Sequence, residues 1–199
     1  MKETNLKDLT RFDLYFPGYW LSGDDRDWGF RVNSTLWLVQ DLFAEAVAAY
    51  ALFQPITKEN ALEYIQSKRD ESPYERCLNS LYAKAFVFSL HSIGELLRHL
   101  SADTNSPTVV QQLYQEYKEH FSHLKHIRDS AIHIEDRGRC RTRRQQPLQT
   151  NLIVLGCFIE RRFTFTGEDG KQYDIEISDG TLEIARGIIQ EIIEAYTWE

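Results

Sequence analysis

The stretch Ser106–Gly138 reads SPTVVQQLYQEYKEHFSHLKHIRDSAIHIEDRG, and its apolar residues recur every three or four positions. That spacing places them along one side of an α-helix. Ser106-Pro107 is typical of a helix start, and Gly138 is typical of a helix end. We therefore expect one long helix from Ser106 to about Glu135. Its buried stripe is expected to consist of Val110, Leu113, Tyr117, Leu124, Ile127, Ala131 and Ile134.

Two further long helices are expected before this one. The first runs from about Asn33 to Phe53 and ends before Pro55. The second begins at Ser72-Pro73-Tyr74-Glu75, which combines a cap, a proline and a capping-box glutamate, and continues to about Leu100. A short helix capped by Thr57 is expected between them. The apolar face of the second long helix is expected to hold Leu78, Leu81, Ala85, Phe88, Ile93 and Leu96.

Near the C-terminus the apolar period changes from that of a helix to that of a strand. Residues 152–155 and 163–165 indicate strands, 167–171 is a hairpin turn, and 173–177 alternates. A last helix then follows Ser178-Asp179-Gly180.

The predicted fold class is mainly α: an antiparallel helical bundle with a C-terminal β-hairpin followed by a final helix. We expect one domain over 1–199. Its expected parts are an irregular aromatic arm over 1–30, a helical core over 31–137, and the hairpin plus last helix over 151–199.

Composition places the chain among globular proteins, with 42% hydrophobic and 27% charged residues. Three cysteines without paired spacing fit a reducing compartment. The N-terminus carries no signal-peptide pattern, and the longest uninterrupted apolar runs have eight residues, far short of the roughly 20 of a membrane span. These features predict a cytoplasmic protein without a membrane segment.

Charge is unevenly distributed along the chain. The net charge is −7, which disfavours binding of nucleic acid over the whole surface. Residues 137–162 nevertheless contain seven arginines and a single acid, Glu160. The first five, which follow the long helix, are Arg137, Arg139, Arg141, Arg143 and Arg144. They could bind the phosphates of RNA, or they could form a mobile polar loop, and the sequence supports both interpretations equally.

Late in the expected helix, Arg128-Asp129-Ser130-Ala131-Ile132-His133 combines a cation, an acid and an imidazole. On a regular helix His133 points roughly 160° away from the buried stripe, and Asp129 lies one turn before it. The simplest interpretation is a solvated helix face with an ordinary i,i+4 pair. Arg128 and His133 are about 140° apart, so they converge only if the arginine reaches round, the helix is locally widened, or a second copy completes the site.

This arrangement resembles the signature of the HEPN superfamily: Arg, a polar residue, three more residues and His, late in a long helix of a bundle. The resemblance covers roughly residues 33–137. It implies a compact helical domain, and in many members a homodimer that cleaves RNA without a metal in toxin–antitoxin and other defence systems. The hairpin and last helix lie outside the common core.

The resemblance also implies roles for the motif residues. His133 would act as general base or acid on the ribose 2′-hydroxyl or the leaving oxygen, and Arg128 would hold the scissile phosphate. Asp129 would orient His133. Glu95, on the preceding helix, is a further candidate for the cleft, although such residues are usually plain helix edges.

We expect no metal and no cofactor. His120, His123 and His126 fan too widely over a helix to bind one ion, and no glycine-rich phosphate loop is present. Two other functions stay open. One is a HEPN-like domain without catalysis that binds a partner such as a nucleotidyltransferase or an antitoxin. The other is that the chain is an unrelated helical bundle, in which the spacing of Arg128 and His133 is a coincidence.

Overall fold

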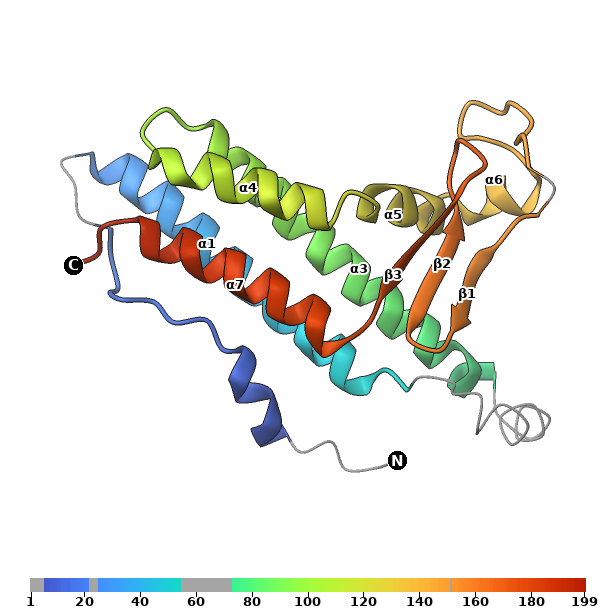
Figure 1. Ribbon diagram of the computed structural model, residues 1–199, viewed down its shortest axis with the longest axis horizontal. Helices are drawn as coiled ribbons and strands as arrows, with labels where there is room; N and C mark the ends of the chain where they lie inside the picture. The colour runs from blue at the N-terminus through green and yellow to red at the C-terminus, as the bar shows by residue number, and fades with distance from the viewer. Residues whose placement is uncertain (1–5, 22–24, 55–72, 151) are drawn as a thin grey trace. The chain divides into compact units, whose positions relative to one another are not determined.

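The computed structural model describes residues 6–21, 25–54, 73–150 and 152–199, and the chain is mainly helical, as predicted (Figure 1). A small antiparallel sheet precedes the last helix. The predicted short helix after Thr57 lies outside the described residues. The elements in order are η1 (a 3₁₀-helix, Leu6–Phe12), α1 (Arg26–Leu52), α3 (Pro73–Ala102), α4 (Thr108–His120), α5 (Leu124–Ile132), α6 (Ile134–Gly138), β1 (Leu155–Ile159), β2 (Arg162–Thr166), β3 (Gln172–Glu176) and α7 (Asp179–Ala195).

The chain forms two compact units, each assembled from segments that are distant in sequence. The first unit comprises Met1–Ala48, Ser89–Ser122 and Asp179–Glu199. The second comprises Ala49–Phe88 and His123–Ser178. Residues of the predicted helical core, 31–137, therefore belong to both units.

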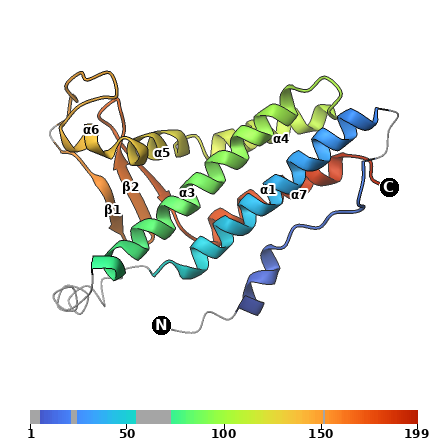
Figure 2. The ribbon, with the colours of Figure 1, turned by 180° about the vertical axis from the view of Figure 1, so that it is seen from behind.

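The first unit is a bundle of antiparallel helices, with α4 and α7 in front of the first-unit parts of α1 and α3 in Figure 1. α4 packs against α7, and the two run in opposite directions (Figure 1). Seen from behind, the first-unit parts of α1 and α3 lie side by side and are also antiparallel (Figure 2). α7 is strongly amphipathic, and its buried stripe comprises Leu182, Ala185, Ile188, Ile189, Ile192 and Ile193. Burial of each leucine or isoleucine in this stripe stabilises the unit by about 1.5–3 kcal/mol.

A buried tyrosine joins α4 to α3 within this unit. The Tyr117 hydroxyl donates a hydrogen bond of 2.7 Å to the Leu90 carbonyl, and burial raises the pKa of Tyr117. Gly94 leaves room for the ring, because a Cβ there would stand 3.1 Å from Tyr117 Cε1. The close approach of the two helices therefore depends on a residue without a side chain.

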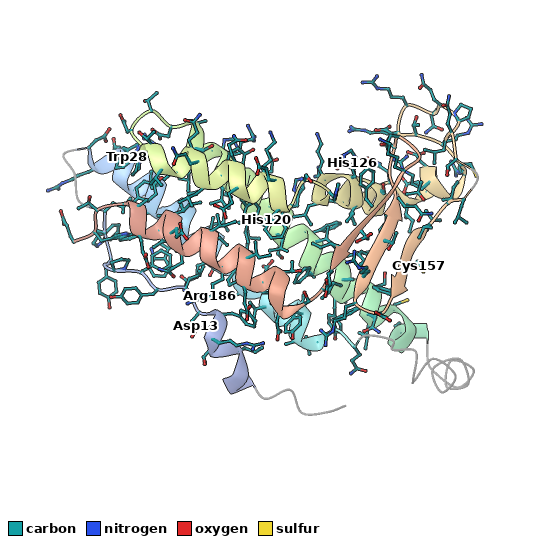
Figure 3. The ribbon with its side chains drawn as sticks, viewed as in Figure 1. Asp13, Trp28, His120, His126, Cys157 and Arg186 are labelled. Atoms are coloured by element: carbon teal, nitrogen blue, oxygen red, sulfur yellow. The ribbon has the colours of Figure 1, made fainter. Side chains whose placement is uncertain are left out.

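The N-terminal aromatic segment is tied to α7 by backbone hydrogen bonds. Gln190 accepts from the Tyr15 N–H at 2.9 Å and donates to the Tyr15 carbonyl at 2.8 Å. Arg186 Nε donates to the Asp13 carbonyl at 3.2 Å, and both residues are labelled in Figure 3. These bonds hold an irregular stretch on the surface of a helix.

The predicted irregular arm over 1–30 is too long, because α1 begins at Arg26. The Asp25 carboxylate accepts a hydrogen bond of 2.9 Å from the Trp28 N–H, which is the geometry of a helix N-cap. η1 also lies inside the predicted irregular segment. Asp25 therefore caps α1, which begins at Arg26 and not at the expected Asn33.

α1 is long and apolar enough, by length and composition, to span a membrane. An 18-residue window of α1 reaches a mean hydropathy of 1.2, and 33% of that window is buried inside the protein. The polar residues of α1 are spaced out along the helix, so its apolar character does not show as a long uninterrupted apolar run. Core helices of soluble proteins meet the same criterion, so cytoplasmic location stays a prediction.

The second unit is built around the antiparallel sheet, in the order β1-β2-β3. β2 is central, and its Phe163 and Phe165 are buried. α5 packs against β2 and β3, and Ser130 Oγ donates a buried hydrogen bond of 2.9 Å to the Thr166 carbonyl. The predicted turn at 167–171 is confirmed, with the Gly167 N–H bonded to the Lys171 carbonyl at 2.7 Å.

The first strand lies later in the chain than predicted: β1 starts at Leu155, where the expected strand over 152–155 ends. It also pairs with β2, so the expected hairpin is two strands of a three-stranded sheet. A bulge between Leu155 and Cys157, with Gly156 at φ 73°, shifts the register. The extra residue of a bulge interrupts the alternation of inward and outward side chains from which a strand is predicted.

The long helix expected over 106–135 is three helices. α4 ends at His120, a turn covers 121–123, and α5 and α6 are separated at His133. The first break coincides with the boundary of the two units, so α4 and α5 contribute their apolar residues to different cores. Ile134, expected in the buried stripe, follows the second break and is 38% exposed.

The expected apolar face of α3 is also wrong in its N-terminal half. Leu78 and Leu81 are 41% and 59% exposed. Ile93 is buried, as predicted. The other buried apolar residues of α3 before Ser101 are Ala83, Phe86, Val87, Leu90, Leu97 and Leu100, none of which was expected on this face. α3 carries apolar residues on more than one side, so periodicity alone does not choose the face that packs.

Candidate functional site

The position of the Arg128–His133 motif follows from how α5 packs on the sheet. Leu124, Ile127 and Ser130 face inward and are buried. Arg128 and Asp129 therefore lie on the opposite border of the helix, where both are partly exposed. The predicted accessibility of these two residues is confirmed.

His133 does not continue the helix, contrary to the sequence prediction. Its backbone turns away at φ −103° and ψ 41°. Its N–H still donates to the Asp129 carbonyl at 3.0 Å, while its own carbonyl accepts from the Asp136 and Arg137 N–H groups at 3.2 Å each. The residue thus closes α5 and opens α6. Its side chain is 28% exposed, in the short connection between two helices.

Arg128 and Asp129 pair with each other. Arg128 Nη2 lies 2.6 Å from Asp129 Oδ1, and both side chains are about one-third exposed. Arg128 Nε is buried and has no hydrogen-bond partner among the described residues. The expected contact of Asp129 with the His133 ring is not formed, because its carboxylate is turned toward Arg128.

The nearest carboxylate to the His133 ring is that of Glu135, with 4.0 Å between Nδ1 and Oε1. Asp136, which is buried, lies on the same short helix, and its Oδ1 accepts a hydrogen bond of 2.8 Å from Gln145 Nε2. The ligating atoms of His133, Glu135 and Asp136 lie within 4.8 Å of one another, so this group could hold a metal ion. Tetrahedral zinc needs ligand atoms about 3.3 Å apart, so the side chains would have to rotate toward one another.

The five arginines after the motif separate into one buried and four exposed residues. Arg137 is only 1% exposed, and its Nη1 donates to the Arg141 carbonyl at 2.8 Å. The prediction that Arg137 contacts RNA is therefore wrong, because it lies beneath the segment that follows it. The exposed residues are Arg139, Arg141, Arg143 and Arg144.

These arginines are carried by a small hairpin, residues 139–148, which we call the arginine hairpin. The Leu148 N–H donates to the Cys140 carbonyl at 2.9 Å, and the Thr142 N–H donates to the Gln146 carbonyl at 2.8 Å. Arg141 and Pro147 form an antiparallel bridge. The segment that carries these arginines is therefore a hydrogen-bonded hairpin.

The arginine hairpin adjoins the turn between β2 and β3. The Arg143 N–H donates to Glu168 Oε1 at 2.9 Å. A Cβ placed on Gly170 would stand 2.6 Å from the Gln149 carbonyl oxygen, so the two backbones approach closely. Exposed guanidinium groups are thereby held next to the sheet.

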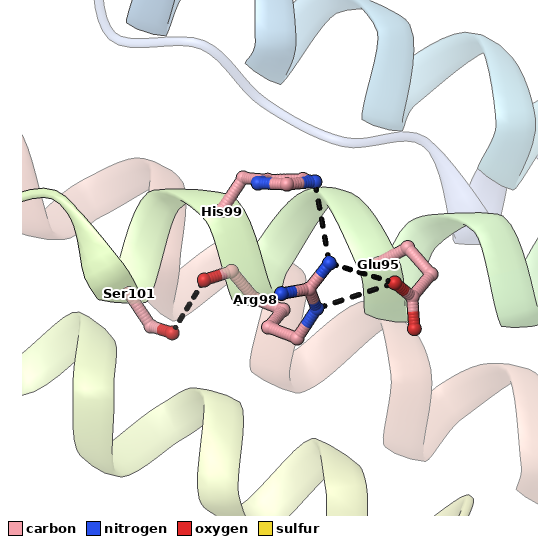
Figure 4. Close-up of polar contacts among 4 residues, drawn as sticks. All are labelled: Glu95, Arg98, His99 and Ser101. Atoms are coloured by element: carbon pink, nitrogen blue, oxygen red, sulfur yellow. Dashed lines mark hydrogen bonds and ion pairs between the residues drawn. The ribbon is translucent and has the colours of Figure 1, made fainter.

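Glu95, the predicted cleft residue, belongs to the first unit, whereas the motif belongs to the second. Its carboxylate accepts hydrogen bonds from Arg98 Nε at 3.2 Å and Nη2 at 3.0 Å (Figure 4). Arg98 Nη2 is also 3.4 Å from His99 Nε2. A role of Glu95 in a cleft stays a prediction.

An aromatic pair on the second unit was missed by sequence reasoning. His126, on α5 and labelled in Figure 3, stacks on Tyr173 of β3, with ring centroids 4.2 Å apart and planes inclined by 7°. His123 lies 5.3 Å from the same ring at 40°. The sequence contains both histidines, but only the packing of α5 on the sheet brings Tyr173 to them.

Hydrogen bonds fix the Tyr173 ring. Its hydroxyl donates to Asp169 Oδ2 at 2.6 Å, which raises the pKa of Tyr173 to about 12. Burial by itself raises the pKa of Asp169. The bonds from Tyr173 and the Lys171 N–H, with the charges of Lys171 and His126, outweigh burial and lower the pKa of Asp169. The ionised carboxylate therefore anchors the ring at neutral pH.

A separate pocket of about 320 Å³ lies on the first unit. Half of its lining residues are aromatic, namely Tyr15, Phe16, Tyr19 and Trp37, and the rings of Phe16 and Trp37 are stacked. Gln40 is the polar side chain in the lining. Titratable groups that could move a proton are absent from it apart from the two tyrosines.

Taken together, the second unit carries a partly exposed Arg–Asp pair, a histidine between two helices, the four exposed arginines of the arginine hairpin and a stacked His–Tyr pair. Comparison with known proteins finds no family model, no curated protein and no solved structure that matches the chain.

Proposed function

We propose that the protein is a HEPN-like endoribonuclease that works without a metal and acts as a homodimer. The observation that carries the proposal is the grouping, in one unit, of Arg128, His133 and the arginine hairpin. Arg128 and His133 are accessible, and the exposed guanidinium groups follow them along the chain. These are the groups needed to bind an RNA backbone and to move a proton at one of its phosphates.

The reaction follows from the chemistry of these groups. His133 takes the proton of a ribose 2′-hydroxyl, whose oxygen attacks the adjacent phosphorus and forms a new P–O bond. The bond to the 5′-oxygen of the next nucleotide breaks, and that oxygen takes a proton from an imidazolium. Arg128 binds the phosphoryl oxygens and stabilises their charge. The products are a 2′,3′-cyclic phosphate and a 5′-hydroxyl end.

The proposed dimer supplies a second imidazole, which the reaction needs and a single motif does not provide. Within a chain, the Arg128 guanidinium pairs with Asp129, and the His133 ring is nearest to Glu135. A second copy facing this surface would bring another imidazole, so that one accepts a proton while the other donates one. Phosphate would compete with Asp129 for Arg128, because both bind a guanidinium through charged oxygens.

The test is cleavage of labelled RNA by the purified chain in excess EDTA, beside His133→Ala and Arg128→Ala. We expect cleavage by the unsubstituted chain, cyclic-phosphate ends by mass spectrometry, and a loss of at least about 100-fold in each variant. His120→Ala is the matched control, because this histidine is exposed and lies at the end of another helix. It should cleave normally.

EDTA also tests the group His133, Glu135 and Asp136 as a metal site. Cleavage that EDTA abolishes and a divalent ion restores would contradict a metal-independent reaction. Cleavage that persists in His133→Ala would show that the motif is not the active site.

A second function is supported by the carboxylates beside the motif. Arg128 is paired at 2.6 Å and His133 has Glu135 as a neighbour, which suits a HEPN-like module that binds a partner and performs no chemistry. Its partner would be a nucleotidyltransferase or an antitoxin. Absence of cleavage over several RNAs, with a folded and dimeric chain, would favour this module.

A further inference from the structure

We infer that the His126–Tyr173 pair is a stacking subsite for a base of single-stranded RNA, adjacent to the motif. The inference rests on the proposed function and adds to it the part of the substrate that is recognised. The two rings are nearly parallel at 4.2 Å, and His126 is exposed. Stacking of the pair occupies one face of each ring, and a base would extend the stack on the other face of His126.

The platform is arranged before RNA arrives. Tyr173 is held through its hydroxyl by Asp169, and its backbone is paired with Phe165 of β2. His126 is fixed by α5, whose neighbouring Ile127 is buried. A base that joins two rings already in place loses less free energy to ordering than one that must assemble them.

Charge around the platform fits a nucleic-acid backbone. The arginine hairpin adjoins the same β2–β3 turn that carries Asp169, through the bond of the Arg143 N–H to Glu168. Both carboxylates of the turn already have partners. Glu168 accepts that hydrogen bond, and Asp169 accepts one from the Tyr173 hydroxyl and lies 3.8 Å from the Lys171 ammonium. Guanidinium groups for phosphates beside aromatic faces for bases are the elements with which proteins bind single strands.

The distance to the motif suits one RNA strand. His126 and Ile132 are six residues apart on α5, which is about 9 Å along the helix axis, and His133 follows directly. Stacked nucleotides advance about 3.4 Å each. A base on His126 would therefore lie about three stacked nucleotides from a phosphate at His133.

The experiment measures binding in a chain that cannot cleave. A short RNA containing 2-aminopurine is titrated into His133→Ala, and the fluorescence of the base is quenched if it stacks. Adding His126→Ala should weaken binding about 5- to 10-fold and remove the quenching, the lower end of the usual effect of a stacking ring. His126→Phe keeps a flat ring and should bind like the parent.

Three controls separate stacking from packing. His123→Ala removes the tilted neighbour of Tyr173 and should leave binding unchanged. Tyr173→Phe loses the bond to Asp169 but keeps the ring, and should retain quenching. The third control is an RNA that lacks the base at the quenched position. It should bind His133→Ala with the same affinity whether or not His126→Ala is added, because without the base there is no stacking left for the His126 ring to contribute.

The outcomes distinguish this inference from the proposed function. If His126→Ala weakens intact and abasic RNA by the same factor, or leaves the quenching unchanged, the platform is packing only and the inference is wrong. If quenching depends on His126 but the unsubstituted chain never cleaves RNA, the subsite stands and the ribonuclease proposal fails. If the chain binds no RNA, both fail.

Discussion

Arg137 shows at the scale of one residue how a charge can serve structure instead of binding. It is almost completely buried, its Nη1 donates to the Arg141 carbonyl at 2.8 Å, and its Nε has no partner among the described residues. No carboxylate of the described chain lies within ion-pair distance of it. Burying a cation this way costs free energy, which the hydrogen bond and the packing of its long stem must offset.

Substitution of Arg137 separates these contributions. We expect Arg137→Ala to lower the free energy of unfolding by about 2–4 kcal/mol, because it leaves a cavity and an unpaired Arg141 carbonyl. Arg137→Met keeps most of the volume and removes the buried charge, so its loss should be clearly smaller. Urea unfolding measures both, with exposed Arg139→Ala as the control within about 0.5 kcal/mol of the parent. Equal losses in the Met and Ala variants would contradict this account.

At the scale of elements, one glycine is required by the strand that contains it, and another weakens the helix that contains it. Gly156 forms the bulge of β1 at φ 73°, and a Cβ there would stand 3.0 Å from the Phe165 ring. Gly187 lies inside α7, and a Cβ there would meet nothing within 4 Å. A bulge needs glycine for its backbone conformation, whereas a helix interior is weakened by it.

The two glycine-to-alanine substitutions should therefore change stability in opposite directions. Gly156→Ala should lower the free energy of unfolding by about 1–3 kcal/mol, through the positive φ and the contact with Phe165. Gly187→Ala should raise it by about 0.5–1 kcal/mol, because alanine restricts the unfolded chain and favours the helix. Thermal unfolding followed by circular dichroism measures both. A stabilised Gly156→Ala would show that the bulge does not require glycine.

At the scale of the whole molecule, two exposed aliphatic side chains flank the motif histidine along the chain. Ile132 and Ile134, on either side of His133, are 47% and 38% exposed. Exposed aliphatic residues are common when scattered. Two of them flanking a proposed catalytic histidine are what a dimer that brings two motifs together would bury.

We expect the chain to be dimeric in light scattering, and Ile132→Asp to shift it toward monomer. Burial of one isoleucine contributes about 1.5–3 kcal/mol, so loss at both copies should weaken the dimer at least about tenfold. Ile184→Asp, at a similarly exposed position of α7, should leave the dimer intact. A monomeric parent chain, or equal effects of the two substitutions, would remove the support for a site shared between copies.

Much of the architecture could be predicted from local signals. The start of α3 at Pro73, the start of α4 next to Pro107, the turn at 167–171 and the final helix all follow from caps, turn residues and periodicity. These signals act within one or two helical turns, which is why a single sequence reveals them. The accessibility of Arg128 and Asp129 also followed from the helix period around Leu124 and Ile127.

Only the tertiary structure decided which apolar residues pack, where the long helix breaks and what surrounds the motif. The breaks at 121–123 and at His133 carry no proline or glycine, and the first of them falls at the boundary between two cores whose residues are distant in sequence. The burial of Arg137 and the stacking of His126 on Tyr173 depend on the same kind of contact. The sequence by itself determined the local conformations, because these depend on neighbouring residues. Long-range packing decided which charges are exposed and which rings meet, because burial free energy is gained only when distant segments close on one another.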